Sequence, residues 1–364
     1  MSEQNLFLVE SSPQIRHRDS TSSIMWQVSI ALMPAGIWGI WVFGIRSLLV
    51  IAVSIASAVG FEYLAARSMK RSTVSDGSAF LTGLLIGYNM PPLVPLFIPV
   101  AASAFAILVV KWAFGGLGAN WMNPALAGRV FVFFSWTSGM NAWKLPRTIQ
   151  AADGVSSATV LGSLKTLLMD FSGEASSAVG MLRYHEYPAS AIGQQISSWF
   201  DRVMQMRISA YTVDLAVGNV PGSIGEVSAV LLIIGGIYLL AKNIITWEIP
   251  VTYILSFALL IWAFDGLRFG QGLFSGDAAF HVLSGGLMLG ALFMATDMVT
   301  SPVTRKGMIV YGIGAGMLTF LIRVYGSLPE GVSMAIIIMN IFVPMINRYM
   351  QPKVYGTAAR RGSA

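Results

Sequence analysis

Ten apolar runs, five on each side of one long polar segment, constrain the fold of this chain more than any other feature. The runs cover about residues 24–43, 47–66, 78–90, 94–113 and 123–138, and then 226–243, 249–264, 279–297, 307–324 and 332–347. Hydrophobic residues make up 55% of the chain and charged residues 11%, which is about half the charge of a soluble domain. We therefore expect an all-α integral membrane protein with about ten transmembrane helices.

One long polar segment, residues 139–225, separates the two groups of apolar runs. It is too long and too polar to lie in hydrocarbon, so we expect a long outer loop that forms a surface subdomain. Because five spans precede this loop, the second group must insert upside down relative to the first. The predicted parts are a cytoplasmic N-terminal segment, a first membrane repeat, an extracytoplasmic loop, a second membrane repeat and a cytoplasmic tail, at 1–23, 24–138, 139–225, 226–347 and 348–364.

Short motifs at matching places favour two inverted five-helix repeats with broken helices. The sequence GLLI at 83–86 precedes a Pro-Pro pair, and the similar GALF at 290–293 precedes a Ser-Pro pair. FGGLG at 114–118 is likewise similar to YGSLP at 325–329. Inverted repeats with helices interrupted by glycine and proline are typical of transport proteins. The alternative is that apolar helices resemble one another in any membrane protein.

Lysine and arginine in the short connections predict the orientation of the chain. If every run spans, thirteen lie on one side and three on the other, so both termini are expected to be cytoplasmic and the loop 139–225 to face outward. Positive charge therefore reflects topology, and nucleic acid is not an expected partner. The thirteen are Arg16, Arg18, Arg67, Lys70, Arg71, Lys111, Lys242, Arg305, Lys306, Arg348, Lys353, Arg360 and Arg361, and the three are Arg46, Arg268 and Arg323.

Cysteine is absent, which excludes disulfides and cysteine-ligated iron–sulfur clusters within the chain. The three histidines, His17, His185 and His281, are far apart in sequence and form no metal-binding or haem-binding pattern. Redox chemistry in this chain would therefore require an organic cofactor or a centre in a partner.

The run 78–90 is too short to cross a membrane. As a helix it would extend about 20 Å, against about 30 Å of hydrocarbon. Pro91-Pro92 removes two backbone donors and ends the helix, and Asp76 can cap its start. We expect a helix that stops partway, with backbone groups that face protein, water or a bound species. A buried helix without any ligand is the alternative.

The sequence FGGLGAN at 114–120 continues to NPALAGR at 123–129. It follows a helix and lacks the lysine and hydroxyl of a phosphate-binding loop, so it predicts a tight re-entry turn, with Asn120 and Asn123 as caps and Pro124 at a helix start. Arg129 then lies one turn into an apolar helix, where a lone cation needs an anion or helix-end carbonyls. Arg129 is a candidate cofactor-binding residue, and a structural or snorkelling role is the alternative.

The sequence MATDMVTSP at 294–302 places Asp297 near Thr296 and Thr300 at the end of an apolar run. Carboxylate, hydroxyl and carbonyl oxygens are ligands that Na⁺ can use. Asp76 stands at the corresponding place in the first half, so Asp76, Asp297 and Thr300 are candidate residues of a sodium path. The alternative is a helix-end turn in which the carboxylate is satisfied locally.

The sequence DGVSSAT at 153–159 lies within the long polar loop. A threonine hydroxyl flanked by small residues on a flexible loop can be reached by a modifying enzyme, and it can hold a phosphate ester at the edge of a bilayer. Taken alone, a loop rich in serine, glycine and threonine is usually only a loop. Thr159 is the candidate attachment site, surrounded by Asp153, Gly154, Ser156, Ser157 and Ala158.

These motifs occur together, in this order and spacing, in a known family of membrane proteins. With the Ser-Ser-Pro at 11–13, DGSA at 76–79 and TGLL at 82–85, they make the chain resemble the D subunit of the Rnf complex. In large part they also resemble the B subunit of the sodium-pumping NADH:quinone oxidoreductase, although the short polar N-terminus is more similar to the Rnf protein. Ser157 stands where the family more often has glycine, and we expect attachment to tolerate this small residue.

The resemblance implies a flavoprotein subunit of an ion-translocating ferredoxin:NAD⁺ oxidoreductase in a prokaryotic cytoplasmic (inner) membrane. Electrons would pass between ferredoxin and NAD⁺ through flavins and iron–sulfur clusters, coupled to movement of Na⁺ or H⁺. Thr159 would carry FMN through a phosphodiester made by a flavin transferase, and a second, non-covalent flavin such as riboflavin would lie among the helices. The implied partners are the other Rnf subunits and membrane lipid, and the chain would not be catalytically complete alone.

Two other classes of protein share some of these features. A passive channel or transporter with inverted repeats would explain ten spans and broken helices, but not the motif in the outer loop. A purely structural membrane anchor would explain only the hydrophobicity. The B subunit of the sodium-pumping quinone reductase is the alternative within the family.

Overall fold

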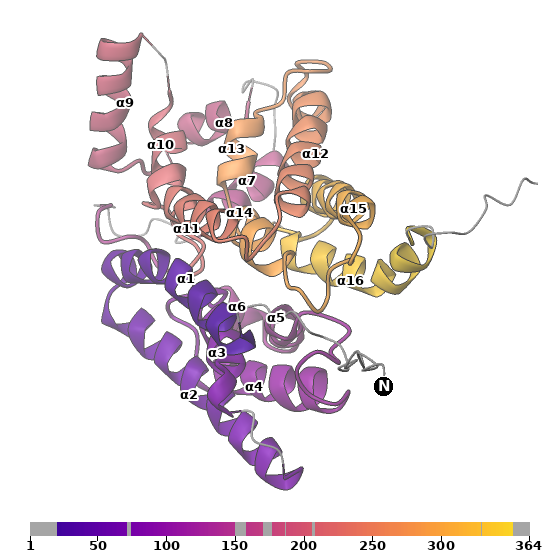
Figure 1. The fold of residues 1–364 in the computed structure, drawn as a ribbon. Helices are drawn as coiled ribbons and strands as arrows, with labels where there is room; N and C mark the ends of the chain where they lie inside the picture. Colours follow the sequence, from indigo (N-terminus) through magenta and orange to yellow (C-terminus); the bar gives the residue numbers. More distant parts are fainter. Residues whose placement is uncertain are drawn as a thin grey trace, which may run out of the picture.

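The computed structural model describes residues 20–70, 74–149, 158–169, 177–185, 187–205, 208–328 and 330–351. All regular secondary structure within these residues is helical, and the helices form two apolar groups separated along the chain by four further helices (Figure 1). The expected all-α architecture is therefore confirmed.

The first group begins with two long helices that meet at one residue. α1 (Thr21–Phe43) and α2 (Ile45–Ser68) are joined by Gly44, whose φ of 94° lies in the left-handed region that favours glycine. α4 (Phe97–Ala104) and η2 (Phe105–Trp112) together form one apolar helix, and its second part has π-helical hydrogen bonding. The shorter elements of this group are η1 (Val74–Asp76), α3 (Ser78–Tyr88), α4 (Phe97–Ala104), η2 (Phe105–Trp112), α5 (Pro124–Ser135) and α6 (Thr137–Met140).

The polar loop contributes four helices, three of which pack on the second group. They are α7 (Val160–Met169), α8 (Ala178–Tyr184), α9 (Ala191–Met204) and α10 (Ala210–Val217). Side chains of α7, α8 and α10 share an apolar cluster with Phe269 and Phe280, which belong to the second group. The carboxylate of Asp214 joins α10 to the start of α9, because it accepts a hydrogen bond of 2.8 Å from the Ser190 backbone N–H.

The second group contains long helices and one segment broken into short pieces. The predicted apolar run 279–297 forms no continuous helix, because it holds three short pieces, α13 (Ala278–Leu283), α14 (Leu287–Leu289) and η4 (Gly290–Met294). The elements are α11 (Ala229–Ala241), α12 (Glu248–Phe264), η3 (Asp265–Phe269), α13 (Ala278–Leu283), α14 (Leu287–Leu289), η4 (Gly290–Met294), α15 (Arg305–Val324) and α16 (Val332–Tyr349).

Five helices among the described residues are long and apolar enough to cross a membrane. They cover Thr21–Phe43, Ile45–Ser68, Glu248–Phe269, Arg305–Val324 and Val332–Tyr349. Four shorter apolar helices accompany them, at Ser78–Tyr88, Phe97–Trp112, Pro124–Ser135 and Ala229–Ala241. The chain is thus a multi-pass membrane protein, whereas ten spans in two inverted repeats stay a prediction.

The two groups pack directly on one another. α1 contacts α11 and α5 contacts α16, and in Figure 1 the first group lies below the second, with α1 beside α11. At Gly235 of α11 a Cβ atom would overlap the carbonyl oxygen of Ala31 in α1, so glycine is needed for this close approach. The apolar core is therefore shared between helices far apart in sequence.

The end of α3 shows how a broken helix is satisfied inside the protein. α3 ends at Tyr88, just before Pro91-Pro92, as the sequence predicts. Backbone carbonyls freed there accept hydrogen bonds from the segment before α11: Gly225 N–H bonds to Tyr88 O at 3.0 Å, and Ile224 N–H bonds to Met90 O at 3.1 Å. The backbone groups left without helical partners at the end of α3 therefore face protein, one of the three environments expected for them.

Candidate functional site

Thr159 lies at the N-terminal end of α7, where it caps the helix. Its Oγ1 accepts a hydrogen bond of 3.1 Å from the Gly162 backbone N–H, and the residue is 7% exposed. The carbonyl oxygen of the preceding Ala158 accepts a hydrogen bond of 3.1 Å from the Tyr187 hydroxyl. The hydroxyl is thus buried against a helix start instead of standing free on a loop. Asp153, Gly154, Ser156 and Ser157 lie outside the described residues.

A narrow pocket of about 20 Å³ lies beside Thr159. Leu161, Leu215 and Val220 give it an apolar wall, while Glu226 and Glu330 contribute carboxylates. The pocket therefore joins α7 and α10 to residues at the border of the second apolar group.

Arg129 lies on α5, next to the two acids of that pocket, and is 8% exposed. Its guanidinium is 3.0 Å from Glu226 Oε1 and 2.6 Å from Glu330 Oε2. It also donates hydrogen bonds of 2.8 Å to Asn89 Oδ1 and to Ser333 Oγ. The anionic partner that the sequence requires for this cation is present, in the form of two carboxylates.

Glu226 and Glu330 were missed by sequence reasoning. They lie 97 and 201 residues from Arg129 along the chain, so no local pattern could pair them. The only available signal is that each acidic residue stands at the edge of an apolar run. Both carboxylates line the pocket beside Thr159, and both pair with Arg129. This pair of acids therefore connects two predicted site residues, Thr159 and Arg129.

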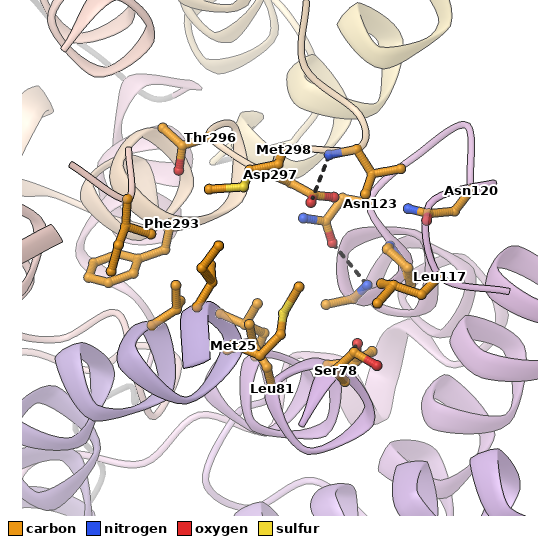
Figure 2. A pocket seen from close by; sticks show the side chains of 18 of the residues that line it. Met25, Ser78, Leu81, Leu117, Asn120, Asn123, Phe293, Thr296, Asp297 and Met298 are labelled. Atoms are coloured by element: carbon orange, nitrogen blue, oxygen red, sulfur yellow. Dashed lines mark hydrogen bonds between the residues drawn. The ribbon is translucent and has the colours of Figure 1, made fainter. Parts of the chain in front are cut away.

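A larger pocket of about 110 Å³ lies between the two groups of helices. Figure 2 shows Met25, Leu81 and Phe293 along its apolar side, with the amides of Asn120 and Asn123 on the other. Asn123 caps α5, because its Oδ1 accepts hydrogen bonds from the Ala125 and Leu126 N–H groups at 3.0 and 3.3 Å. The pocket thus offers an apolar surface with polar groups near one edge.

Asp297 lines this pocket and is hydrogen-bonded to Thr300. Asp297 accepts hydrogen bonds from Val299 N–H at 3.3 Å and from the Thr300 hydroxyl at 3.1 Å. Thr296 bonds instead to the Leu292 carbonyl at 2.8 Å, so its hydroxyl turns away from the carboxylate. No group of three or more histidine, cysteine or acidic residues suited to a metal ion occurs within the described ranges.

Asp76 lies apart from Asp297, in a different polar cluster. Its carboxylate accepts hydrogen bonds from the Ser78 N–H at 2.8 Å and the Ser78 hydroxyl at 2.5 Å, so it caps α3 as expected. The same hydroxyl accepts a hydrogen bond of 2.7 Å from Lys111 Nζ. Asp76 is therefore linked through Ser78 to a buried lysine.

Lys111 requires a correction of the topology argument. The sequence places it among the cations of the short connections, but it is 2% exposed and its Nζ lies 2.9 Å from Glu62 Oε1. Arg323, counted on the other side, is 4% exposed. These two cations are buried because they have internal partners, so neither reports on orientation. The remaining connection residues keep the same strong asymmetry.

Comparison with known proteins shows similarity along almost the whole chain. A family model described as NQR2, RnfD, RnfE matches residues 8–356. The chain is 40% identical, over 97% of both chains, to the D subunit of the proton-translocating ferredoxin:NAD(+) oxidoreductase complex of Clostridium ljungdahlii. It is 41% identical, over 98% of this chain and 97% of the other, to the D subunit of the Na(+)-translocating complex of Acetobacterium woodii. The D subunit of the ion-translocating oxidoreductase complex of Stutzerimonas stutzeri is 36% identical over 94% of both chains.

Proposed function

Because the chain belongs to the NQR2, RnfD, RnfE family, we propose that it is the membrane flavoprotein subunit of an ion-translocating ferredoxin:NAD⁺ oxidoreductase complex. In this role it carries electrons through FMN bound covalently to Thr159 and contributes to translocation of Na⁺ or H⁺. It works with the other subunits of the complex and is not catalytically complete alone. The names of its relatives, all complex subunits, argue against a passive channel and against a purely structural anchor.

The position of Thr159 at the start of α7 is the observation that carries the proposal. Helix N-termini favour phosphate, because their free N–H groups and the helix dipole both attract negative charge. A phosphodiester at Oγ1 would lie within reach of the Gly162 N–H, which now bonds to that oxygen. The neighbouring pocket of about 20 Å³ is too small for a flavin ring, so the ring of an attached FMN would lie outside it. FMN attached to Thr159 would supply the electron-transfer chemistry.

The burial of Thr159 has a consequence for maturation. Because Thr159 is only 7% exposed, its hydroxyl cannot reach the active site of a flavin transferase in this packed state. We therefore place attachment before α7 docks on the second group of helices. The carboxylates of Glu226 and Glu330 stay compatible with a nearby phosphate, because Arg129 neutralises part of their charge.

The direct test compares two threonines of the same region. Thr159→Val should abolish in-gel flavin fluorescence of the polypeptide while the chain still inserts in the membrane. Thr166→Val is the matched control, since Thr166 is an exposed hydroxyl on α7 and should keep full fluorescence. A fluorescent Thr159→Val band would refute attachment at this residue.

The larger pocket between the helix groups is the proposed site of a second, non-covalent flavin such as riboflavin. Its apolar side and the amides of Asn120 and Asn123 match the flat apolar surface and polar edge of an isoalloxazine ring (Figure 2). Asn123→Leu should lower the riboflavin released from the denatured complex and leave the covalent flavin unchanged. If the Asn123→Leu complex releases as much riboflavin as the unchanged complex and keeps its covalent flavin, this placement is wrong.

Asp76, Asp297 and Thr300 are proposed to affect ion coupling. Asp297 lines the larger pocket and Thr300 supplies an adjacent oxygen, so a cation or a proton can balance negative charge there. Asp76 stands at the start of a broken helix in the first half. The local hydrogen bonds of both carboxylates also fit a capping role, so the two roles must be separated by measurement.

The proposed orientation has both termini in the cytoplasm and residues 139–225 outside, in the cytoplasmic membrane of a prokaryote. The chain has no cysteine, so single cysteines can be introduced cleanly. An impermeant thiol reagent applied to intact cells should label Ser172→Cys and spare Ser363→Cys. The reverse pattern of labelling would invert the proposed topology.

A further inference from the structure

A small pocket under α7 is lined by basic side chains. Four basic side chains border it, namely Lys165 of α7, Arg268 of η3, His281 of α13 and Arg323 of α15. Leucines of α7 line the rest of the pocket. Its volume is about 10 Å³, which is room for roughly one water molecule or one ion of similar size. The pocket lies at the point where the outer helices meet the second group.

The charges around this pocket do not balance. Asp265 is the carboxylate beside it, 3.5 Å from Arg268 Nη1 and 3.3 Å from His281 Nε2. Glu330 and Glu226 are near Arg323, but both form ion pairs with Arg129. Burial and the charge of Arg268 together lower the pKa of Lys165. Positive charge is therefore in excess at this place.

Several hydrogen-bonding atoms at the pocket have no partner. Arg323 donates from Nε to Glu330 O at 3.1 Å and from Nη1 to His281 O at 2.5 Å, but its Nη2 has no hydrogen-bond acceptor among the described residues. Within the same ranges, Nδ1 of His281 also has no hydrogen-bond partner, whereas its Nε2 faces Asp265 Oδ2 at 3.3 Å. Arg323 is 4% exposed and His281 is 1% exposed. Donors buried in this way cost free energy unless something accepts from them.

We infer that this pocket binds a compact monovalent anion such as chloride, which accepts from Arg323 Nη2 and His281 and lies close to Lys165 and Arg268. The size of the pocket favours a single-atom ion over a polyatomic one. The anion would connect α7 to η3, α13 and α15, and so hold in place the helix that begins beside Thr159. The site itself does not depend on the presence of flavin.

The test uses the purified complex and chloride itself as the probe. Thermal unfolding is followed while chloride replaces gluconate at constant ionic strength and pH. The unfolding midpoint should rise by about 2–4 °C in a saturable way with chloride and with bromide. Arg323→Gln should abolish this rise, and Lys165→Met, a change at a partly exposed residue, should increase the half-saturating chloride concentration at least about tenfold.

Arg305→Gln is the matched control, because Arg305 is an arginine of the same helix whose side chain is 87% exposed. It should respond to chloride as the unchanged protein does. Equal midpoints in chloride and gluconate would overturn the inference, as would a Lys165→Met complex with an unchanged chloride response. Protection that appears only when phosphatidylglycerol is added at constant chloride would assign the pocket to a lipid phosphate and would also overturn it.

Discussion

Two buried acid–base clusters, one in each group of helices, differ in how completely their atoms are paired. In the first group, Lys111 Nζ lies 2.9 Å from Glu62 Oε1 and donates to Ser78 Oγ at 2.7 Å, while Trp112 Nε1 donates to Glu62 Oε2 at 2.9 Å. In the second group, Asp265, His281 and Arg323 are equally buried and Asp265 Oδ2 faces His281 Nε2 at 3.3 Å, but His281 Nδ1 and Arg323 Nη2 keep no hydrogen-bond partner among the described residues.

The difference separates a structural cluster from a binding site. A buried ion pair whose hydrogen bonds are all made has nothing left to offer a ligand, and it chiefly fixes how α2 packs on η2. Unpaired donors beside a small pocket have a cost that a ligand can recover. The first cluster should therefore govern stability, whereas the second should govern a response to anions.

The largest expected effect comes from breaking the first cluster. Glu62→Gln leaves Lys111 as a buried cation without its carboxylate, which should lower the free energy of unfolding by about 3–5 kcal/mol. The yield of assembled complex and its thermal midpoint should both fall, and added chloride should not restore them. The double change Glu62→Gln with Lys111→Met removes both charges and should recover much of the loss. A single variant as stable as the unchanged protein would contradict the structural role.

A smaller effect is expected from the matching change in the second cluster. Asp265→Asn removes the carboxylate beside the basic pocket, which should cost about 1–3 kcal/mol at low chloride. Here chloride should restore stability, with a half-saturating concentration roughly threefold lower than in the unchanged protein, because positive charge then has no fixed counterion. A chloride titration of the thermal midpoint measures both quantities. Failure of chloride to rescue this variant would remove the distinction between the two clusters.

The smallest effect on stability is expected at the two capping carboxylates. Asp76→Asn and Asp297→Asn keep shape and most hydrogen bonding, so each should change the free energy of unfolding by about 1 kcal/mol or less. Assembly and flavin content should survive, while ion-dependent turnover should fall. Turnover and ion uptake in vesicles, measured over a range of Na⁺ concentrations and pH, provide the check. Normal turnover with unchanged ion dependence would leave both residues as caps only.

Much of the helical framework can be predicted from local sequence. All ten apolar runs contain helices in the structure, α3 ends before Pro91-Pro92, and Asn123 caps α5 with Pro124 in its first turn. These features follow from backbone chemistry within a few residues, namely a missing donor or a side-chain acceptor at a helix start. For that reason no tertiary information is needed to find them.

The partners of buried charges could not be predicted in the same way. Lys111 stands near the end of an apolar run, where the sequence indicates a connection, yet its partner Glu62 lies on another helix. Arg129 pairs with two acids far away in sequence. Hydropathy assigns every charged residue near a helix end to the surface, and only the packing of α2, α5 and α16 reveals which ones turn inward. The unpaired donors of Arg323 and His281 are visible only at that level.

The central claim is that Thr159 carries a flavin through its phosphate, and mass spectrometry of the isolated polypeptide tests it most directly. The intact mass should exceed that of the unmodified chain by one FMN less one water, and fragmentation should place the addition on Thr159. The Thr159→Val variant should show the mass of the unmodified chain. An unmodified wild-type mass from a fully active complex, or an FMN adduct on any other residue, would contradict the account.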